Sequence, residues 1–363
     1  MPVIVASVMA VAAGAAPVAV ADTPIATCNV PIPMSDGAVM RANITRPGPG
    51  RYPTVVTVTG YGKGASTSCS ASTDPLVAAG YNVVTIDDRG TGSSGGRWDV
   101  WSERTQQDYT EEGQWIVNQP WSTSDLGTQG GSYLGITSLL FAERNPDLVK
   151  AIYANVPMAD AYRDVTFFGG NLDTTFMPFW FGVTQGLSST GTGDLLTQDS
   201  PTGPQFLQNV YDHATANPAE FGAQLIEGSV SGNKEGFFQG YDSDTYRLRS
   251  PVEQASKIKA AVFYTGGWFD IFQRGEPYLY NSFVSSPKVV WVQDSTYHAA
   301  GTSHFSSLGF PSDVKVRWFD RYIRGVDNGS DQLPSISFWD INANEWEHPS
   351  GWPRPDAQWT NYY

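Results

Sequence analysis

The amino-acid sequence predicts an α/β protein with a mostly parallel sheet that helices cover on both faces. Three observations support this fold class. Strand-like and helix-like segments alternate over residues 54–154 and again over residues 258–324. The segment 54–59, TVVTVT, has the continuous β-branched composition of a strand buried on both sides. Ser132, which lies among glycines, follows a strand-like segment and opens a helix-like one, which is the pattern of a nucleophile elbow.

The individual elements follow from local patterns, taken in chain order. Two strands, 29–34 and 39–45, are expected around the turn Ser35-Asp36-Gly37. The first alternating region then comprises a strand at 54–59, a helix at 74–79, a strand at 81–86, a helix at 105–118, a strand at 125–129, a helix from the elbow to residue 144 and a strand at 148–154. The second comprises a strand at 258–265, a helix after Asp270, a strand at 288–293 and a helix at 313–324.

An insertion of about residues 157–254 separates the two alternating regions. It has little strand pattern and many Gly, Thr and aromatic residues. A long insertion between sheet strands is typical of a cap over a functional site. Its aromatic side chains, Phe168 among them, are expected either to line a pocket for an apolar group or to form a small core of the cap. Another aromatic segment, with antiparallel character, begins at residue 333.

Composition limits the classes of partner. The 363 residues suffice for one large domain with additions, and the formal net charge is −14. Nucleic acids and anionic membranes bind basic patches, and the sequence has no Lys/Arg cluster, so we expect neither partner. The sequence suggests no metal, nucleotide or flavin site, and we expect no cofactor.

The N-terminal residues 1–21 have the apolar composition of a signal peptide. Ala19-Val20-Ala21 fits the small-x-small rule, which predicts cleavage after Ala21 and a secreted or extracytoplasmic protein. No Lys or Arg precedes the apolar run, and a retained membrane anchor is the alternative. In an oxidising compartment, Cys28 and Cys69 are expected to form a disulfide; two buried free thiols are the other possibility.

Ser132 needs a base to take its proton, and the base needs an acid to orient it. In hydrolases built on such sheets the chain order is Ser, acid, His, with the acid and His after late strands. His298 follows the strand 288–293, and His304 is its competitor. Asp270 follows the strand 258–265; its rival is Asp294, and a role as a helix cap is its alternative.

A tetrahedral intermediate also needs two hydrogen-bond donors for its oxyanion. The elbow supplies one, the backbone N–H of Tyr133. The other is expected from the loop at residues 60–64, where the phenol of Tyr61 could donate. Packing of that loop is the alternative role for Tyr61.

A series of motifs resembles the group that includes cocaine esterases, X-Pro dipeptidyl-peptidases and α-amino-acid ester hydrolases, the CocE/NonD hydrolases. The motifs, in chain order, are Ser35-Asp36-Gly37, Gly60-Tyr61-Gly62-Lys63, the segment 87–96 (DDRGTGSSGG), Gln119-Pro120-Trp121, the segment 130–135 (GGSYLG), Gly267-Trp268-Phe269-Asp270, Tyr297-His298 and the segment 318–325 (WFDRYIRG). The resemblance implies an α/β-hydrolase fold with Ser132, Asp270 and His298 as the triad, and Tyr61 and Tyr133 as the oxyanion donors. The residues Asp294-Ser295-Thr296 before Tyr297 depart from the G-P-W-x-H pattern that is frequent in the group.

The resemblance also implies a domain organisation. We expect a catalytic domain over residues 28–330 and, at 333–363, the start of a C-terminal jelly-roll that would be truncated. Exposed aromatic strands in such a segment predict poor solubility or self-association.

The substrate implied by the resemblance is a small-molecule ester or a short peptide. We expect a carboxylic-ester hydrolase first, an X-Pro dipeptidyl-peptidase second and, as a different class, an inactive binding protein of the same fold. Members that recognise an amino group need carboxylates in the pocket, for which Asp160, Asp164 and Asp173 are candidates. Trp268 and Phe168 are further candidates for contact with substrate.

Overall fold

The computed structural model describes residues 23–66, 69, 74–190, 209, 211–213, 240–284, 287–294, 298 and 313–361. The predicted signal peptide, His304 and much of the predicted cap lie outside these residues. In the described ranges, no helix combines the length and the apolar character needed to cross a bilayer.

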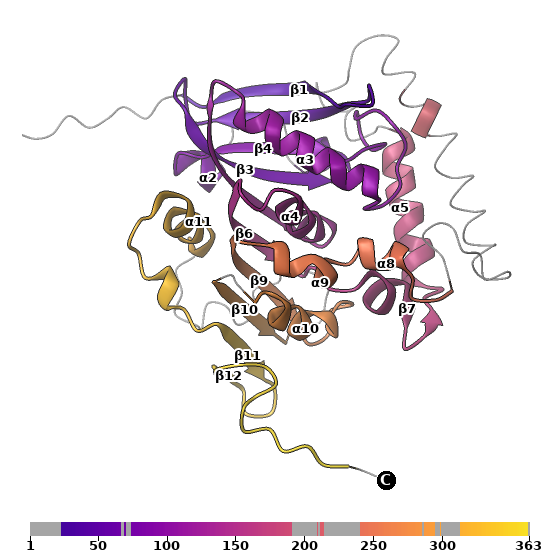
Figure 1. The fold of residues 1–363 in the computed structure, drawn as a ribbon, viewed down its shortest axis with the longest axis vertical. Coiled ribbons are helices and arrows are strands. Elements are labelled where there is room, and N and C mark those ends of the chain that lie inside the picture. The colour runs from indigo at the N-terminus through magenta and orange to yellow at the C-terminus, as the bar shows by residue number, and fades with distance from the viewer. Residues whose placement is uncertain are drawn as a thin grey trace, which may run out of the picture.

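A ten-stranded sheet forms the centre of the molecule (Figure 1). Its order is β1-β2-β4-β3-β5-β6-β9-β10-β11-β12. The strands are β1 (Ile25–Pro33), β2 (Val39–Arg46), β3 (Tyr52–Thr59), β4 (Asn82–Asp87), β5 (Ser122–Gly131), β6 (Val149–Asn155), β9 (Ala261–Gly267), β10 (Lys288–Gln293), β11 (Ile336–Asp340) and β12 (Glu345–Glu347). The seven strands from β4 to β11 are parallel, and β1, β2 and β12 are antiparallel at the two ends. The predicted mostly parallel sheet is therefore confirmed.

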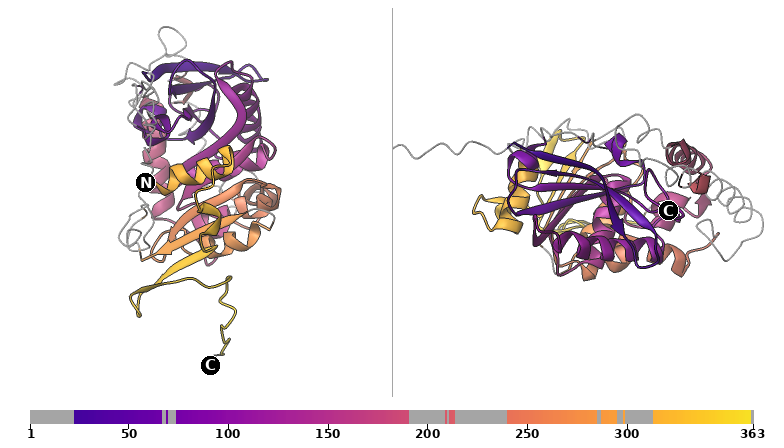
Figure 2. Two further views of the ribbon diagram at one scale, coloured as in Figure 1. Left: turned by 90° about the vertical axis from the view of Figure 1, so that its left-hand side faces the viewer. Right: turned by 90° about the horizontal axis from the view of Figure 1, so that it is seen from above.

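Helices cover both faces of this sheet (Figures 1 and 2). They are α1 (Lys63–Ser66), α2 (Pro75–Ala78), α3 (Glu103–Val117), α4 (Tyr133–Arg144), α5 (Phe176–Thr190), α8 (Asp244–Leu248), α9 (Pro251–Gln254), α10 (Gly275–Ser282) and α11 (Val314–Arg324). Helix α4 packs on β3, β5 and β6 and also contacts α3. Helix α11 packs on β5 and β6 as well, but its buried residues belong to a different hydrophobic core from those of α4.

Alternate residues of the central strands supply two separate hydrophobic cores. Val56 of β3 and Val84 of β4 belong to the core that includes α3 and α4. Their neighbours Val55 and Val83 belong to the core that includes α2 and α11. Side chains alternate across a strand, so a strand with a helical layer on each face is apolar at every position. This explains the unbroken β-branched composition of residues 54–59.

The segment between β6 and β9 contains the predicted insertion. Its described part comprises a π-helix (Ala161–Thr166), the two-stranded hairpin β7 (Phe167–Phe168) and β8 (Asn171–Leu172), and the helices α5, α8 and α9. Helix α5 is amphipathic in its contacts, since Met177 and Phe181 are buried while Phe179 is exposed. This helix borders the site described below.

The segment that begins at residue 333 differs from its prediction. Strand β11 pairs in parallel with β10, and β12 pairs with β11, so both strands extend the main sheet. Ile336 and Phe338 are buried in the larger core. The outer edge of β10 offers unpaired backbone groups and an apolar surface, which this strand covers. Residues 336–347 thus extend the main sheet. The predicted domain division at residue 333 and the predicted self-association stay predictions.

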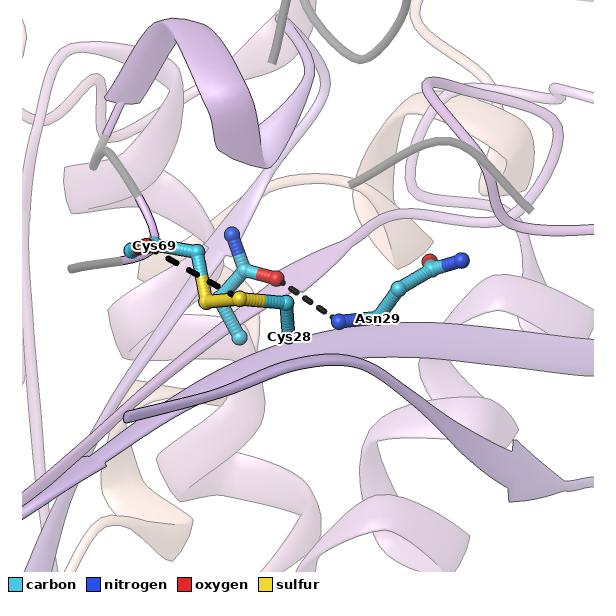
Figure 3. Close-up of a disulfide and its surroundings, with 4 residues drawn as sticks. Cys28, Asn29 and Cys69 are labelled. Carbon is cyan, nitrogen blue, oxygen red and sulfur yellow. Dashed lines mark hydrogen bonds between the residues drawn. A yellow bond between two sulfur atoms is a disulfide. The ribbon is translucent and has the colours of Figure 1, made fainter. Parts of the chain in front are cut away.

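A disulfide joins Cys28 of β1 to Cys69, with 5.7 Å between the Cα atoms (Figure 3). The neighbouring Asn29 donates its backbone N–H to the side-chain oxygen of Asn43 at 3.0 Å. The bridge ties the edge strand β1 to the segment that follows α1. The structure therefore contains the predicted cysteine pair.

Candidate active site

Ser132 occupies a sharp turn between strand β5 and helix α4. Its φ of 56° and ψ of −124° lie in a region that L-residues rarely adopt and that costs about 1–3 kcal/mol. The turn is held by a hydrogen bond from the Ser132 N–H to the carbonyl of Asn155 in β6, at 2.9 Å. The strained backbone directs the serine side chain out of the strand-to-helix connection, as predicted for a nucleophile elbow.

Two glycines permit the close approach of strand and helix at this turn. A Cβ on Gly130 would lie 2.4 Å from the backbone carbon of Leu134, and a Cβ on Gly135 would lie 2.8 Å from the carbonyl oxygen of Asn155. Both contacts are with backbone atoms, which cannot rotate away. The G-x-S-x-x-G spacing therefore follows from packing around the elbow.

The three residues of the predicted triad form a hydrogen-bonded chain. His298 Nε2 lies 2.5 Å from Ser132 Oγ, and His298 Nδ1 lies 2.8 Å from Asp270 Oδ2. The side chain of Asp270 is fully buried, and its other oxygen accepts the backbone N–H of Phe272 at 2.7 Å. The imidazole also packs edge-on against the Phe272 ring, with centroids 5.0 Å apart. The ring is thus fixed between an alcohol and a carboxylate.

Topology explains why residues so distant in sequence meet. Ser132, Asp270 and His298 follow the parallel strands β5, β9 and β10, whose carboxyl ends lie at one edge of the sheet. Asp270, and not its rival Asp294, is the residue that lies against His298 Nδ1.

A second carboxyl group, that of Glu276, lies near enough to Asp270 to interact with its charge. Glu276 is buried, and its Oε2 accepts the backbone N–H of Gly267 at 2.8 Å. Burial, together with the nearby charge of Asp270, raises the pKa of Glu276 well above its usual value. The raised pKa favours the neutral form of Glu276 beside the Asp270 carboxylate. Nothing in the residue pattern of the sequence had indicated this role for Glu276.

The two predicted oxyanion donors lie beside the serine. Tyr133 is the first residue of α4, so its backbone N–H has no acceptor within the helix. The phenol of Tyr61 accepts the indole N–H of Trp180 at 2.9 Å and also interacts with the Ser132 side chain. Burial raises the pKa of Tyr61, while these two hydrogen bonds lower it. A protonated phenol next to Ser132 can donate a hydrogen bond.

The buried carboxyl group of Asp88 holds the side chain of Tyr133 in place. The Tyr133 phenol donates to Asp88, which also accepts the phenol O–H of Tyr109 at 3.2 Å. Burial raises the pKa of Asp88 to about 7, although the hydrogen bond from Tyr133 opposes this rise. Asp88 lies in the segment 87–96 (DDRGTGSSGG), whose residue pattern alone does not indicate this contact.

A buried ion pair holds the loop that contains Tyr61. The Lys63 ammonium lies 3.0 Å from Asp87 Oδ2, both side chains are fully buried, and the Lys63 backbone N–H also donates to Asp87. Asp87 is the last residue of β4, so the pair connects the Tyr61 loop to the end of the neighbouring strand. The G-Y-G-K motif is thereby explained by structure as well as by chemistry.

A mostly apolar pocket opens beside Ser132. It has an empty volume of about 260 Å³, open mouth included. Its lining comprises Tyr61, Trp101, Ser132, Tyr133, Ile136, Val165, Phe176, Trp180 and Phe272. Val165, Phe176 and Trp180 come from the segment between β6 and β9. Two aromatic side chains of the insertion, Phe176 and Trp180, therefore line a pocket, as predicted.

Trp268 is not among the described residues that line this pocket, and its contact with substrate stays a prediction. Its indole N–H donates to the carbonyl of Trp339 at 2.8 Å. Its ring packs against Phe338 and Trp352. Strand β11 lies in the main sheet and provides an apolar surface for this side chain.

Phe168 and the predicted carboxylates also have structural positions. Phe168 pairs with Asn171 in the β7-β8 hairpin and is 37% exposed. Asp173 accepts the backbone N–H groups of Thr175 and Phe176 at the start of α5, both at 2.9 Å. Asp173 thus holds the backbone of Phe176, which lines the pocket at Ser132. Phe168 and Asp173 are not themselves among the described lining residues, and their contact with substrate stays a prediction.

Asp160 and Asp164 have cationic partners of their own. Asp160 caps the π-helix and pairs with Arg163 at 2.7 Å. Asp164 is buried and pairs with Arg274 at 2.6 Å. Neither carboxylate lines the pocket at Ser132.

Comparison with known proteins assigns the family. The model of the X-Pro dipeptidyl-peptidase (S15) family matches residues 36–298. A cocaine esterase from Rhodococcus sp. is 25% identical over 362 residues, which cover 92% of this chain and 61% of the esterase. A Mycobacterium bovis protein named as a serine esterase is also 25% identical, over 79% of this chain and 51% of its own length. The chain therefore spans between half and about three fifths of these relatives.

Solved structures agree with this assignment. The crystal structure of a CocE/NonD family hydrolase from Staphylococcus aureus superposes with a TM-score of 0.69 and is 25% identical, covering 93% of this chain and 58% of that one. An α-amino-acid ester hydrolase has the same fold, with a TM-score of 0.66. The α/β-hydrolase fold and the resemblance seen in the motifs are both confirmed. The chain belongs to the X-Pro dipeptidyl-peptidase (S15) family, and its relatives include the CocE/NonD hydrolases.

Proposed function

We propose that this chain is a serine hydrolase that cleaves carboxylic esters through an acyl-enzyme. The observation that supports this proposal most directly is the hydrogen-bonded chain of Ser132, His298 and Asp270 at the mouth of an apolar pocket. The names of the esterase relatives agree with it. The same geometry speaks against the alternative of an inactive binding protein, since a binding role requires no such chain.

The proposed reaction has two halves. In the first, Ser132 Oγ attacks the ester carbonyl while His298 Nε2 takes the hydroxyl proton, and the tetrahedral intermediate then expels the alcohol, which receives that proton. In the second, His298 removes a proton from the water that attacks the acyl group, and it returns this proton to Ser132 Oγ as the intermediate collapses and the acid leaves. Asp270 accepts the Nδ1–H of His298 and stabilises the imidazolium.

The oxyanion of each intermediate would lie between the Tyr61 phenol and the Tyr133 backbone N–H. Both donors are present before substrate binds, so they need little reorganisation when charge develops. Removing one donor of this kind typically lowers the rate by about 10²–10³-fold.

The pocket indicates the chemical character of the acyl group. Its lining side chains are aromatic or aliphatic apart from Ser132 and the tyrosine phenols. An uncharged apolar acyl group of modest size would bury apolar surface there without leaving a charge unpaired. We therefore propose esters of short aliphatic or aromatic acids as the substrate class.

An X-Pro dipeptidyl-peptidase is the second candidate, because the matching family model bears that name. A dipeptidyl-peptidase must bind the free amino group of its substrate. Among the described residues that line the pocket there is no carboxylate, and Asp160, Asp164 and Asp173 have other partners. This observation favours the ester.

Export is part of the proposal. The apolar residues 1–21 support it, and so does the Cys28–Cys69 bridge, since disulfides persist mainly outside reducing compartments. Expression with these residues, followed by mass measurement of the product, would test cleavage after Ala21. A product that keeps residues 1–21 would contradict it.

Paired assays would separate the two substrate classes. The purified chain is incubated with p-nitrophenyl butyrate and with Gly-Pro-p-nitroanilide, and Ser132→Ala is the matched control for each. We expect hydrolysis of the ester that requires Ser132 and a much lower kcat/KM for the anilide. The reverse preference would replace the esterase with the dipeptidyl-peptidase.

A further inference from the structure

We infer that Trp180, a residue of the insertion, is a positioning residue that orients the Tyr61 hydroxyl for the oxyanion. The inference rests on the proposed function and adds to it a role for the insertion. The contact that supports it is the hydrogen bond from Trp180 Nε1 to the Tyr61 phenol oxygen, at 2.9 Å.

The chemistry of the two groups sets the direction of this bond. An indole N–H can only donate, so the phenol oxygen of Tyr61 must accept here. A phenol has a single proton, and that proton then points away from Trp180. Among the described residues, the Ser132 side chain is the second hydrogen-bond partner of this phenol. The Tyr61 proton is therefore directed towards the reacting serine, where the oxyanion would form.

The indole itself is held in place from several sides. Its ring stacks on Trp101, with centroids 6.4 Å apart, and meets Trp98 at 5.8 Å. Phe181, its neighbour on α5, packs against it edge-on at 4.9 Å. A fixed donor restricts the rotation of the Tyr61 hydroxyl before substrate arrives, which is the condition under which an oxyanion donor is most effective.

The two partners come from distant parts of the chain. Tyr61 follows β3 in the core of the fold, and Trp180 lies on α5, 119 residues further on. Helix α5 therefore contributes to the chemical step through Trp180, in addition to lining the pocket. Loss of the indole N–H should lower kcat, because the hydroxyl would then adopt other rotamers in the ground state.

A double-mutant cycle tests this inference. Wild type, Tyr61→Phe, Trp180→Phe and the double variant are compared by kcat and KM for p-nitrophenyl butyrate and by their rate of labelling with a fluorophosphonate. We expect Trp180→Phe to lower kcat by about 5- to 10-fold when Tyr61 is present. In the Tyr61→Phe background the same change should alter kcat less than about two-fold, because no hydroxyl remains to be oriented.

Trp101 provides a matched control. It also lines the pocket, but within the described residues its buried indole N–H has no hydrogen-bond partner. Trp101→Phe keeps an aromatic ring against Trp180 and removes no hydrogen bond to Tyr61, so its effect on the rate should depend far less on the Tyr61 hydroxyl than the effect of Trp180→Phe does. If Trp180→Phe unfolds the protein, benzothienylalanine at position 180 keeps the shape of tryptophan and replaces its N–H by sulfur, and it should give the same cycle.

The outcomes are distinct. Equal losses from the Trp180 change with and without the Tyr61 hydroxyl would show that Trp180 acts by packing alone, and would overturn the inference. A folded wild type that hydrolyses no ester and accepts no label on Ser132 would refute the proposed function, and the inference would fall with it.

Discussion

Nδ1 of His298 lies 2.8 Å from Oδ2 of Asp270, a carboxylate with a fully buried side chain. The second oxygen of this carboxylate accepts a backbone N–H, so its orientation is fixed independently of the histidine. The contact requires Nδ1 to bear the proton, which leaves Nε2 as the acceptor that faces Ser132. One carboxylate therefore selects the tautomer in which histidine can act as a base.

Asp270→Asn should lower kcat on the order of 10⁴-fold near pH 7, because the amide can donate to Nδ1 and favour the wrong tautomer. The matched control is Asp294→Asn, which changes an acid close in sequence to His298 that does not contact its Nδ1. We expect it to keep kcat within about two-fold of wild type. Ester hydrolysis and thermal unfolding of each variant are the measurements. Equal losses for the two variants would contradict the assignment.

Tyr61→Phe should lower kcat by about 10²–10³-fold, because it removes one of the two donors to the oxyanion. KM should change little, since the ground-state carbonyl needs this donor less than the oxyanion does. The ring remains to pack against Tyr133, whose centroid is 5.6 Å away. A variant with near-normal turnover would show that the tyrosine only packs its loop.

The buried Asp88 should make stability depend on pH. Its pKa is raised to about 7 in the folded protein, against 3.8 for an exposed aspartate, mainly by burial and against the hydrogen bond from Tyr133. Between these values the folded state binds more protons than the unfolded state. The contribution of Asp88 to stability is therefore complete below about pH 4 and falls as pH rises to about 7.

Asp88→Asn isolates this contribution. The free energy of unfolding of wild type minus that of the variant should fall by at most about 1.4 kcal/mol per pH unit between pH 4 and pH 7, and then level off. Denaturant unfolding at pH 4, 5, 6, 7 and 8 measures the difference. A flat difference, or one that rises with pH, would contradict a raised pKa.

The Cys28–Cys69 bridge should stabilise the chain. It joins residues 41 positions apart, and a loop of this size corresponds to about 4 kcal/mol in the chain-entropy model. Replacement of both cysteines by serine should lower the free energy of unfolding by about that amount. A reductant should destabilise wild type and leave the double variant unchanged, whereas equal melting of all four samples would indicate that the bridge adds nothing.

Chain order and strand ends pointed to the three side chains that the structure brings into hydrogen-bonding contact. Ser132, Asp270 and His298 each follow a parallel strand, and such strands end at one edge of a sheet whatever lies between them in sequence. Local patterns also predicted nearly every strand and helix of the sheet region, because alternation of apolar residues is a local property.

What the sequence did not predict depends on contacts between distant segments. Trp268 donates its indole N–H to Trp339 because β11 joins the main sheet beside it, a pairing that local patterns do not reveal. Asp88 and Glu276 are buried carboxyls whose surroundings come from several elements. The bond from Trp180 to Tyr61 likewise spans two segments whose relative position only the fold determines.

Peptide mapping of the fluorophosphonate adduct is the most direct test of the central claim, which is that Ser132 is a nucleophile activated by His298 and Asp270. The account predicts one adduct per chain, on the peptide that contains Ser132, with labelling abolished in Ser132→Ala and strongly slowed in His298→Ala. An adduct on another residue, or labelling of folded Ser132→Ala at the wild-type rate, would contradict it.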